Sequence, residues 1–290
     1  MGSKLKFNRI GWQFVLLPSA FILLFSFYPM FQSLMLSFQS GKGNVTSFAG
    51  LDNYVRLFSD PMFKQAVLNT LLYLIIQVPI MLFLGLIVAY FLNMPNLRFK
   101  GFYRTAIFLP CVTSLVSYAV LFKSIFAVDG ILNQMLMGIH LIDGPIAWLM
   151  DPVWARVVII AAITWRWTGY NMIFYLSAMQ NIDPSVYEAA SIDGASKTRQ
   201  FFSITVPLLK PIILFTAIIS TNGTLQLFDE VVNITNGGPG NSTMTISQYI
   251  YNLSFVYTPN FGYAATVSYA IVIIVAVLAF IQFKIGGEKK

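Results

Sequence analysis

The sequence has little charge, one cysteine and one histidine. Asp, Glu, Lys and Arg together make up 10% of its 290 residues, whereas a typical soluble domain carries about 25%. The single cysteine, Cys111, excludes an intrachain disulfide, and the single histidine, His140, cannot head a metal-ligand cluster. Apolar residues take their place, because hydrophobic residues reach 57% and the mean hydropathy is +0.71. This balance indicates an integral membrane protein.

Motifs for nucleotide binding and for hydrolysis are missing as well. No G-x-x-x-x-G-K-[S/T] phosphate-binding loop occurs. The run Gly237–Gly240 is rich in glycine, but no lysine follows it, and a tight turn explains it better. Because Gly-x-Ser-x-Gly and His-Glu-x-x-His are also absent, we expect this chain to have no enzyme activity, no cofactor and no metal site of its own.

Six runs are apolar and long enough to cross a bilayer, whose core needs about 20 residues per helix. They are Trp12–Phe38, Ala66–Leu92, Tyr103–Phe126, Val153–Met179, Pro211–Phe228 and Ala264–Phe283. The fifth run is short, and an extension back through Val206–Leu209 would lengthen it. The fold class expected is all-α, with six transmembrane helices in a single domain over residues 1–290 and a cytoplasmic loop over 180–210.

Lysine and arginine are distributed unevenly between the two sides of these runs. With the N-terminus inside, the inner segments hold Lys4, Lys6, Arg9, Arg98, Lys100, Arg104, Lys197, Arg199, Lys210, Lys284, Lys289 and Lys290. The outer segments hold Lys42, Arg56, Lys64, Lys123 and Arg156, while Arg166 falls within the fourth run. Because positively charged loops stay inside, both termini are expected in the cytoplasm of a bacterial cell, with the chain in its plasma membrane.

The loop between the fourth and fifth runs carries its own signals for a helix start. Asp183 can cap free backbone N–H groups, and Pro184 is preorganised for the first helical position. A competing start is a capping box formed by Ser185 and Glu188. Either start predicts a short helix that runs through Ser191.

A glycine then predicts a bend in this loop. The first helix is expected to break around Asp193–Gly194, and a second helical stretch is expected over Ser196–Thr205, until Pro207 stops it. Four apolar side chains can anchor this second stretch against the ends of the spans, namely Phe201, Phe202, Ile204 and Val206. The loop is therefore predicted to form an elbow of two short helices.

Small residues gather around the bend. They are Ala189, Ala190, Gly194 and Ala195, with Glu188 and Asp193 beside them. Small residues let another backbone approach closely, so this surface suits contact with a second protein. The competing interpretation is a tight helical hairpin that packs only on its own chain.

The same residues carry a family resemblance. Glu188-Ala-Ala-x-x-Asp193-Gly194-Ala195, followed by Phe201, Pro207 and Pro211, resembles the cytoplasmic signature loop of ABC-importer permeases. Four further segments resemble the maltose/glycerol-3-phosphate-type carbohydrate permeases, namely Gly50–Tyr54, Phe108–Pro110, Asn236–Gly240 and Phe261–Ala264. The chain is most similar to the first of the two permease subunits, although it lacks the extra N-terminal spans and the large extracellular domain of the enterobacterial maltose version.

This resemblance implies a type I ABC-importer permease fold and a set of partners. The partners would be a second homologous permease subunit, two cytoplasmic ATPase subunits that bind ATP and Mg²⁺, and an extracellular binding protein that delivers a sugar or oligosaccharide. Closure of the ATPases would pull on the loop and switch the permeases between inward- and outward-facing states. The coupling residues implied are Glu188, Ala189, Ala190, Asp193, Gly194 and Ala195.

Polar residues inside two of the runs mark a candidate path for the solute. The path residues expected are Arg166, Trp167, Tyr170, Asn171, Ser220, Asn222, Thr224 and Gln226. Polar groups are costly in hydrocarbon and usually face a cavity or a neighbouring helix, so hydrogen bonds between helices remain the competing explanation. Gln77 and Pro79, in the second run, are interpreted as a kink.

Three alternatives remain open beside a sugar importer. Uptake of glycerol phosphate would need a cationic path, for which Arg166 is the intramembrane candidate. An ion-coupled secondary transporter or a channel is less consistent, because the carboxylates lie in loops or near span ends and no inverted halves are visible. A membrane enzyme lacks a catalytic constellation.

Overall fold

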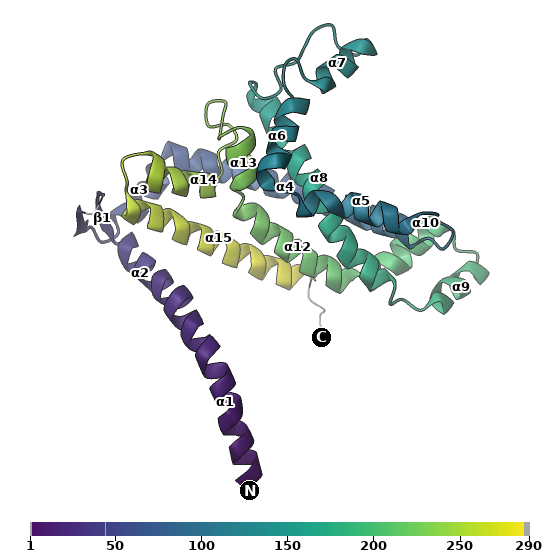
Figure 1. Cartoon of the computed structure of the whole chain (residues 1–290), viewed down its shortest axis with the longest axis horizontal. Coiled ribbons are helices and arrows are strands. Elements are labelled where there is room, and N and C mark those ends of the chain that lie inside the picture. Colours follow the sequence, from purple (N-terminus) through teal and green to yellow (C-terminus); the bar gives the residue numbers. More distant parts are fainter. Residues whose placement is uncertain (1, 44, 287–290) are drawn as a thin grey trace. The chain divides into compact units, whose positions relative to one another are not determined.

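A computed structural model describes residues 2–43 and 45–286, and within these ranges the chain is almost wholly helical (Figure 1). Lys289 and Lys290, two of the predicted inner charges, lie outside the described residues. The chain divides into two compact units, each described here by itself. The first comprises the residues through Asp60 together with Ile250–Ala270, and the second comprises Pro61–Tyr249 and the chain from Ile271 onward.

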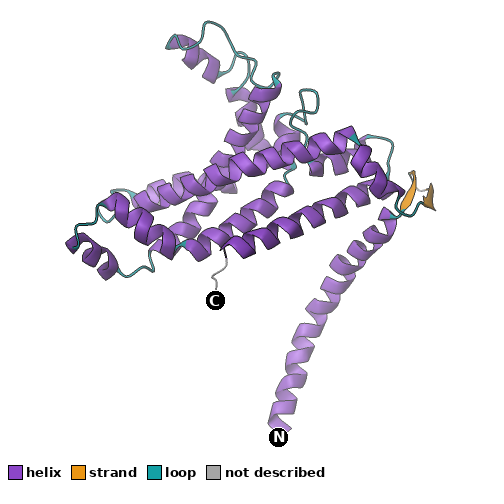
Figure 2. Cartoon of the chain, turned by 180° about the vertical axis from the view of Figure 1, so that it is seen from behind, coloured by secondary structure: helices purple, strands orange, loops and turns teal. Residues whose placement is uncertain are grey.

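The first unit begins with one long apolar helical run. It consists of α1 (Gly2–Ile22), a π-helical turn η1 (Leu23–Phe27) and α2 (Tyr28–Ser37). None of its most apolar 18-residue window is buried, which fits a helix whose surroundings are lipid or another chain. The antiparallel hairpin of β1 (Gln39–Lys42) and β2 (Val45–Phe48) follows and holds the only strands among the described residues (Figure 2).

Buried polar bonds fix the corner of the first unit after the hairpin. Helix α3 (Asp52–Ser59) places Asn53 so that its amide donates to the carbonyl oxygens of Ser37, at 3.0 Å, and of Gln39, at 2.8 Å. Tyr263, near the start of α15 (Phe261–Gly286), donates its hydroxyl to Asp60 at 2.6 Å. The corner therefore satisfies its backbone carbonyls where the chain leaves regular structure.

The second unit is built around two long helices. Helix α4 (Pro61–Asn93) and helix α8 (Pro152–Met179) pack along each other. Asp151 caps α8 through hydrogen bonds from the N–H groups of Val153 and Trp154, at 2.8 and 2.9 Å, and Pro152 occupies the first turn. A Cβ on Gly85 of α4 would meet the Cβ of Asn171 at 3.1 Å, so this glycine lets the two helices approach.

Shorter helices belong to the same unit. They are α5 (Lys100–Val112), α6 (Leu115–Ile125), α7 (Ile131–Gly138), α12 (Lys210–Leu225) and α13 (Asp229–Ile234). Helix α14 (Ile246–Tyr251) begins in this unit, and the π-helical turn η3 (Asn252–Val256) belongs to the first unit. Helix α5 approaches α8 so closely that a Cβ on Gly169 would lie 2.1 Å from the carbonyl oxygen of Ile107. Only glycine fits at this crossing.

The six predicted spans appear as four helices and two bent pairs. Gly11–Ser37, Pro61–Asn93, Pro152–Met179 and Phe261–Gly286 are each long and apolar enough to cross a membrane. The third predicted span is broken between α5 and α6, which meet at 100° after Pro110 and the extended residue Thr113. The fifth also bends, by 69°, at Leu209. Six spans result when each bent pair counts as one.

The outer glycine-rich segment after α13 is held by polar side chains of α4 and α8. Asn69 of α4 donates to the carbonyl oxygens of Asn241, at 3.0 Å, and Met244, at 2.9 Å. Arg156 of α8 donates from Nε to the carbonyl oxygen of Ser242 at 2.8 Å. Gly237, with φ of +82°, and a cis bond before Pro239 shape the turn itself. The expected tight turn is therefore present, and a buried amide and a guanidinium hold it.

Candidate functional site

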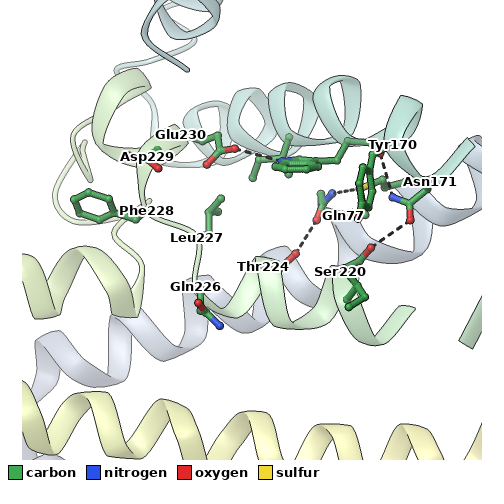
Figure 3. Close-up of a pocket in the computed structure, with 15 residues that line it drawn as sticks. Gln77, Tyr170, Asn171, Ser220, Thr224, Gln226, Leu227, Phe228, Asp229 and Glu230 are labelled. Carbon is green, nitrogen blue, oxygen red and sulfur yellow. Dashed lines mark hydrogen bonds between the residues drawn. The ribbon is translucent and has the colours of Figure 1, made fainter. Parts of the chain in front are cut away.

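A cavity of about 460 Å³ opens between α4, α8, α12 and the segment that precedes α13 (Figure 3). Its lining consists of Gln77, Met81, Ile163, Trp167, Tyr170, Asn171, Ile219, Ser220, Gly223, Thr224, Gln226, Leu227, Phe228, Asp229 and Glu230. Apolar and aromatic groups form most of this wall, and a few polar groups converge on it. That composition is typical of a small-molecule site.

Amides and hydroxyls form two short sets of hydrogen bonds at the cavity. Thr224 donates its hydroxyl to Oε1 of Gln77 at 3.3 Å, which joins α12 to α4. Ser220 donates to Oδ1 of Asn171 at 3.5 Å, which joins α12 to α8. Asn171 also donates from Nδ2 to the carbonyl oxygen of Trp167 at 3.1 Å. The polar side chains thus point at one another and into the same space, as Figure 3 shows for Gln77, Thr224, Ser220 and Asn171.

Aromatic rings stand on the α8 side of the cavity. The rings of Trp167 and Tyr170 meet edge to face at 5.8 Å, and Tyr170 meets Phe174 at 5.0 Å. The indole N–H of Trp167 donates to Oε1 of Glu230 at 3.4 Å. Aromatic faces beside amides and hydroxyls can hold a molecule that has both apolar faces and hydroxyl groups.

Arg166 lies behind this wall and does not line the cavity. Its side chain is 6% exposed, and its guanidinium carbon lies 5.2 Å from the ring centre of Tyr118 and 5.6 Å from that of Trp167. Within the described residues, Nε and Nη1 of Arg166 have no hydrogen-bond partner. Successive residues of a helix point in different directions, so Trp167 faces the cavity while Arg166 faces the neighbouring core.

The structure brings six of the eight predicted path residues to the cavity. They are Trp167, Tyr170, Asn171, Ser220, Thr224 and Gln226. Asn222, like Arg166, is not among the lining residues: it is exposed, and its Oδ1 accepts a hydrogen bond from Gln226 at 2.8 Å. Whether any of the eight touches a solute stays a prediction.

Sequence reasoning missed three polar groups of the cavity, namely Gln77, Asp229 and Glu230. Gln77 was interpreted as part of a kink with Pro79, and the kink stays a prediction. Helix α4 contains both residues, and Gln77 is fully buried at the cavity wall. The signal was an amide within a 33-residue apolar helix. Glu230 was placed at a span end, and its position beside Trp167 depends on the turn that follows α12.

The predicted elbow is present in the loop between α8 and α12. Helix α9 (Pro184–Ile192) begins as expected, because Oδ1 of Asp183 accepts a hydrogen bond from the N–H of Ser185 at 2.9 Å. Asp183, rather than Ser185, is therefore the N-cap. This backbone hydrogen bond, helped by the Ser185 hydroxyl, lowers the pKa of the Asp183 carboxyl below its ordinary value.

The bend falls at the predicted glycine. Gly194 has φ of +77°, a left-handed conformation that glycine adopts without steric cost. The N–H of Ala195 reaches back to the carbonyl oxygen of Ala190 at 2.9 Å and closes the end of α9. A Cβ on Gly194 would meet nothing within 4 Å, so the bend lies open to its surroundings.

The second stretch of the elbow differs from the prediction at its end. It comprises α10 (Lys197–Gln200), a π-helical turn η2 (Phe201–Thr205) and α11 (Val206–Leu208). Pro207 was expected to stop the helix, but it lies in the first turn of α11, where a missing N–H costs nothing. The helical path bends instead at Leu209, before α12.

A few side-chain contacts join the two helical stretches of the elbow to each other and to α4. Tyr187 and Thr205 share a hydroxyl hydrogen bond of 2.9 Å, and Gln200 donates to the hydroxyl of Ser191 at 2.8 Å. Phe201 is buried and meets Tyr90 of α4 at 4.8 Å, as an anchor should. Phe202 was predicted to be an anchor as well, but it is 58% exposed.

The small-residue surface faces outward. Glu188, Ala189, Asp193 and Gly194 are exposed, and Ala190 and Ala195 are half-buried at the bend. A second, open cavity of about 800 Å³ separates α9 from the ends of α4 and α8, with Tyr187 and Glu188 on its wall. The hairpin is therefore not packed tightly on its own chain, which argues against the competing interpretation of this loop.

No group of three or more His, Cys, Asp or Glu side chains in the described residues is placed to hold a metal ion. Cys111 is a free, half-buried thiol and is not among the residues that line the cavity.

Known proteins of similar sequence share one role. Residues 62–284 match the family described as "binding-protein-dependent transport system inner membrane component". The lactose transport system permease protein LacF of Rhizobium radiobacter is 57% identical over 282 residues, which cover 97% of this chain and 95% of that protein. The arabinooligosaccharides transport system permease protein AraP of Halalkalibacterium halodurans is 36% identical over 241 residues, or 81% of this chain and 75% of that protein.

Solved structures agree on the fold. A chain of a bacterial alginate ABC transporter, crystallised in complex with an alginate pentasaccharide-bound periplasmic protein, matches with a TM-score of 0.82 at 24% identity, covering 99% of this chain and 97% of that chain. The likeness confirms the all-α permease fold. Together with the family match and the apolar helices, it shows that this multi-pass chain belongs to the inner-membrane permease components of binding-protein-dependent ABC transport systems.

Proposed function

We propose that the chain is one permease subunit of an ATP-driven importer of a sugar or oligosaccharide. It would pair with a second homologous permease subunit, receive its solute from an extracellular binding protein, and be driven by two cytoplasmic ATPase subunits that bind ATP and Mg²⁺. The similarity to LacF and AraP, which are named as lactose and arabinooligosaccharide permeases, supports carbohydrate as the solute class.

The observation that carries the proposal is the chemistry of the 460 Å³ cavity. Sugars present hydroxyl groups for hydrogen bonding and apolar ring faces for stacking. The cavity offers amides and hydroxyls from Gln77, Asn171 and Ser220 beside the rings of Trp167 and Tyr170. A solute there would replace the weaker of these mutual hydrogen bonds, such as the one of 3.5 Å between Ser220 and Asn171.

The elbow is proposed as the coupling site because the chain links it directly to the cavity. Helix α8 carries Trp167 and Asn171 and ends at Met179, from which α9 follows after a few residues. The nine residues from Asn171 to Met179 span about 12 Å of a rigid helix. On the other side, η2 and α11 lead into α12 with Ser220 and Thr224. Movement of the elbow by an ATPase would reach both cavity walls.

Uptake in proteoliposomes that hold the whole complex tests the solute path. Lactose and arabino-oligosaccharides are the first solutes to try. Gln77→Leu and Asn171→Ala each remove a hydrogen-bonding group from the cavity, and the loss of about 1 kcal/mol per bond predicts a KM about fivefold higher. Pro79→Ala, in the same helix as Gln77 but outside the cavity lining, is the matched control and should leave KM unchanged.

Asn222→Ala tests whether the solute path runs through the cavity or along the exposed face of α12. If the cavity is the path, this variant keeps the wild-type KM. A raised KM for Asn222→Ala, with Gln77→Leu and Asn171→Ala unchanged, would move the path to the exposed face and refute the assignment.

A further inference from the structure

We propose that Asp229 and Glu230 make this cavity a charge filter, which admits uncharged sugars and repels anionic ones such as uronates and sugar phosphates. The inference rests on the proposed function for the location of the solute path, and it narrows the substrate class. Of the fifteen residues that line the cavity, two carry carboxylates, namely Asp229 and Glu230, and none is lysine or arginine.

The two carboxylates lie together at one end of the cavity, in the first turn of α13 (Figure 3). Asp229 is exposed, whereas the Glu230 side chain is only 6% exposed. A carboxylate accepts several hydrogen bonds, so the one from Trp167 to Glu230 leaves acceptor capacity for the hydroxyl groups of a sugar. In their ionised form the same oxygens would repel a carboxylate or a phosphate on the solute. Burial raises the pKa of the Glu230 carboxyl above its ordinary value, which reduces the contribution of Glu230 to this repulsion.

The nearest cation does not present itself to the solute. Arg166 follows Trp165 on the side of α8 that packs in the core, and the rings of Tyr118 and Trp167 lie against its guanidinium. Its guanidinium is buried and does not line the cavity, and its charge acts on Glu230 only as a minor electrostatic contribution. The other arginine of α8, Arg156, is engaged with Ser242 in the outer turn. A solute in the cavity therefore meets the two carboxylates and neither arginine.

This arrangement decides between two solute classes. A glycerol phosphate path would need a cation in the wall, and Arg166 was the candidate for it. Since Arg166 is outside the lining and two carboxylates are inside it, the cavity favours an uncharged polyol. A cleft lined by charges of one sign changes the local concentration of ions by about 10- to 1,000-fold, so even a partial effect is measurable.

Charged thiol reagents measure this potential without depending on what the binding protein delivers. The full complex would carry Cys111→Ala, so that this chain has no other thiol, and Ser220→Cys in the cavity wall. Rates of modification are compared for a cationic methanethiosulfonate (MTSET) and an anionic one (MTSES). Each rate is normalised to that of Asn181→Cys, an exposed position after the end of α8.

We expect the cationic reagent to react about tenfold faster than the anionic one at the cavity position after normalisation. Asp229→Asn and Glu230→Gln, which keep size and hydrogen-bonding capacity, should together bring the ratio close to one. Arg166→Met should raise the ratio further, because it removes the positive charge behind the wall. A ratio near one in the parent, or one that the double amide variant does not change, would overturn the filter.

A neutral reagent distinguishes failure of the filter from failure of the proposed function. Sugar delivered by the binding protein should protect Ser220→Cys from methyl methanethiosulfonate if the cavity is the path. Lack of protection would refute the path, whereas protection with an unbiased charge ratio would refute only the filter.

Discussion

The cavity on α8 and the elbow that follows α8 are built in different ways. The cavity lies among buried helices, where Gln77 and Thr224 meet from positions 147 residues apart. The elbow is exposed, and most of its contacts join residues within twenty positions of each other, such as Tyr187 with Thr205. The cavity presents specific side chains, whereas the elbow presents nearly bare backbone. On the proposed function, the cavity would recognise a solute and a protein surface would close on the elbow.

The comparison predicts its largest effect at Gly169, where the cavity helix crosses α5. A Cβ there would lie 2.1 Å from the carbonyl oxygen of Ile107, which belongs to rigid backbone. Gly169→Leu would force α5 and α8 apart, and overpacking of this kind typically costs about 1–3 kcal/mol or more. We expect little or no assembled complex, measured by yield and by thermal unfolding of the purified protein.

Gly223→Ala is the matched control for that variant. Gly223 also lies in a spanning helix at the cavity, but its Cβ would meet nothing within 4 Å. Normal assembly is expected, because alanine also favours a helix over glycine by about 1 kcal/mol. A normal amount of assembled complex for Gly169→Leu would show that the α5–α8 crossing accommodates an added side chain. The cavity region would then be no more tightly packed than the elbow, which would contradict the comparison.

The second effect concerns function rather than assembly. Gly194→Asp and Ala190→Lys put bulk and charge on the small-residue surface of the elbow, where a partner backbone needs close approach. We expect the complex to assemble and to bind its binding protein, but uptake in proteoliposomes to fall to background while ATP hydrolysis no longer responds to solute. Gly194→Asp also places a side chain at φ of +77°, at a cost of about 1 kcal/mol.

Thr198→Lys is the control that tests whether the effect is specific to the small-residue surface or follows from any added charge in the loop. Thr198 is exposed on α10, beyond the bend and outside the small-residue set. It should transport normally, since the added charge does not block the close approach. Wild-type uptake in both elbow variants would remove the coupling assignment.

The elbow was readable from sequence because its signals are local. Asp183 as cap and Gly194 as bend each follow from the residue type and its immediate neighbours. The one wrong boundary, at Pro207, also has a local cause: proline ends a helix only when it is not in the first turn of the next one. The sequence could not distinguish those two cases.

The cavity was readable only in part. Polar residues inside apolar runs pointed to six of its lining residues, because such residues must face something other than lipid. Which face each one takes depends on how α4, α8 and α12 pack, so Arg166 and Trp167, adjacent in sequence, lie on opposite sides of the wall. Gln77 and Glu230 make their cavity contacts with residues far away in the sequence. Such contacts cannot be predicted from a single sequence.

The smallest predicted effect is the pH dependence of the elbow, and it tests whether local contacts alone hold α9. The folded state lowers the pKa of Asp183 below its ordinary value of 3.8, chiefly through the N–H of Ser185. The cap therefore stabilises α9 fully above the ordinary pKa, and the effect is lost as the pH falls through the lower, folded value. Asp183→Asn keeps a capping oxygen that does not titrate.

Hydrogen exchange of the α9 peptide in the intact complex measures this loss. The ratio of exchange in the wild type to that in Asp183→Asn should stay constant from neutral pH to about pH 5 and rise below pH 4, while peptides of α8 show no change in their ratio. A ratio that is flat throughout would mean that tertiary packing, and not the cap, holds the start of α9. If α9 stays folded after the cap is lost, the cap is not what keeps this helix folded. The elbow would then resemble the cavity, because contacts between residues far apart in the sequence would stabilise it.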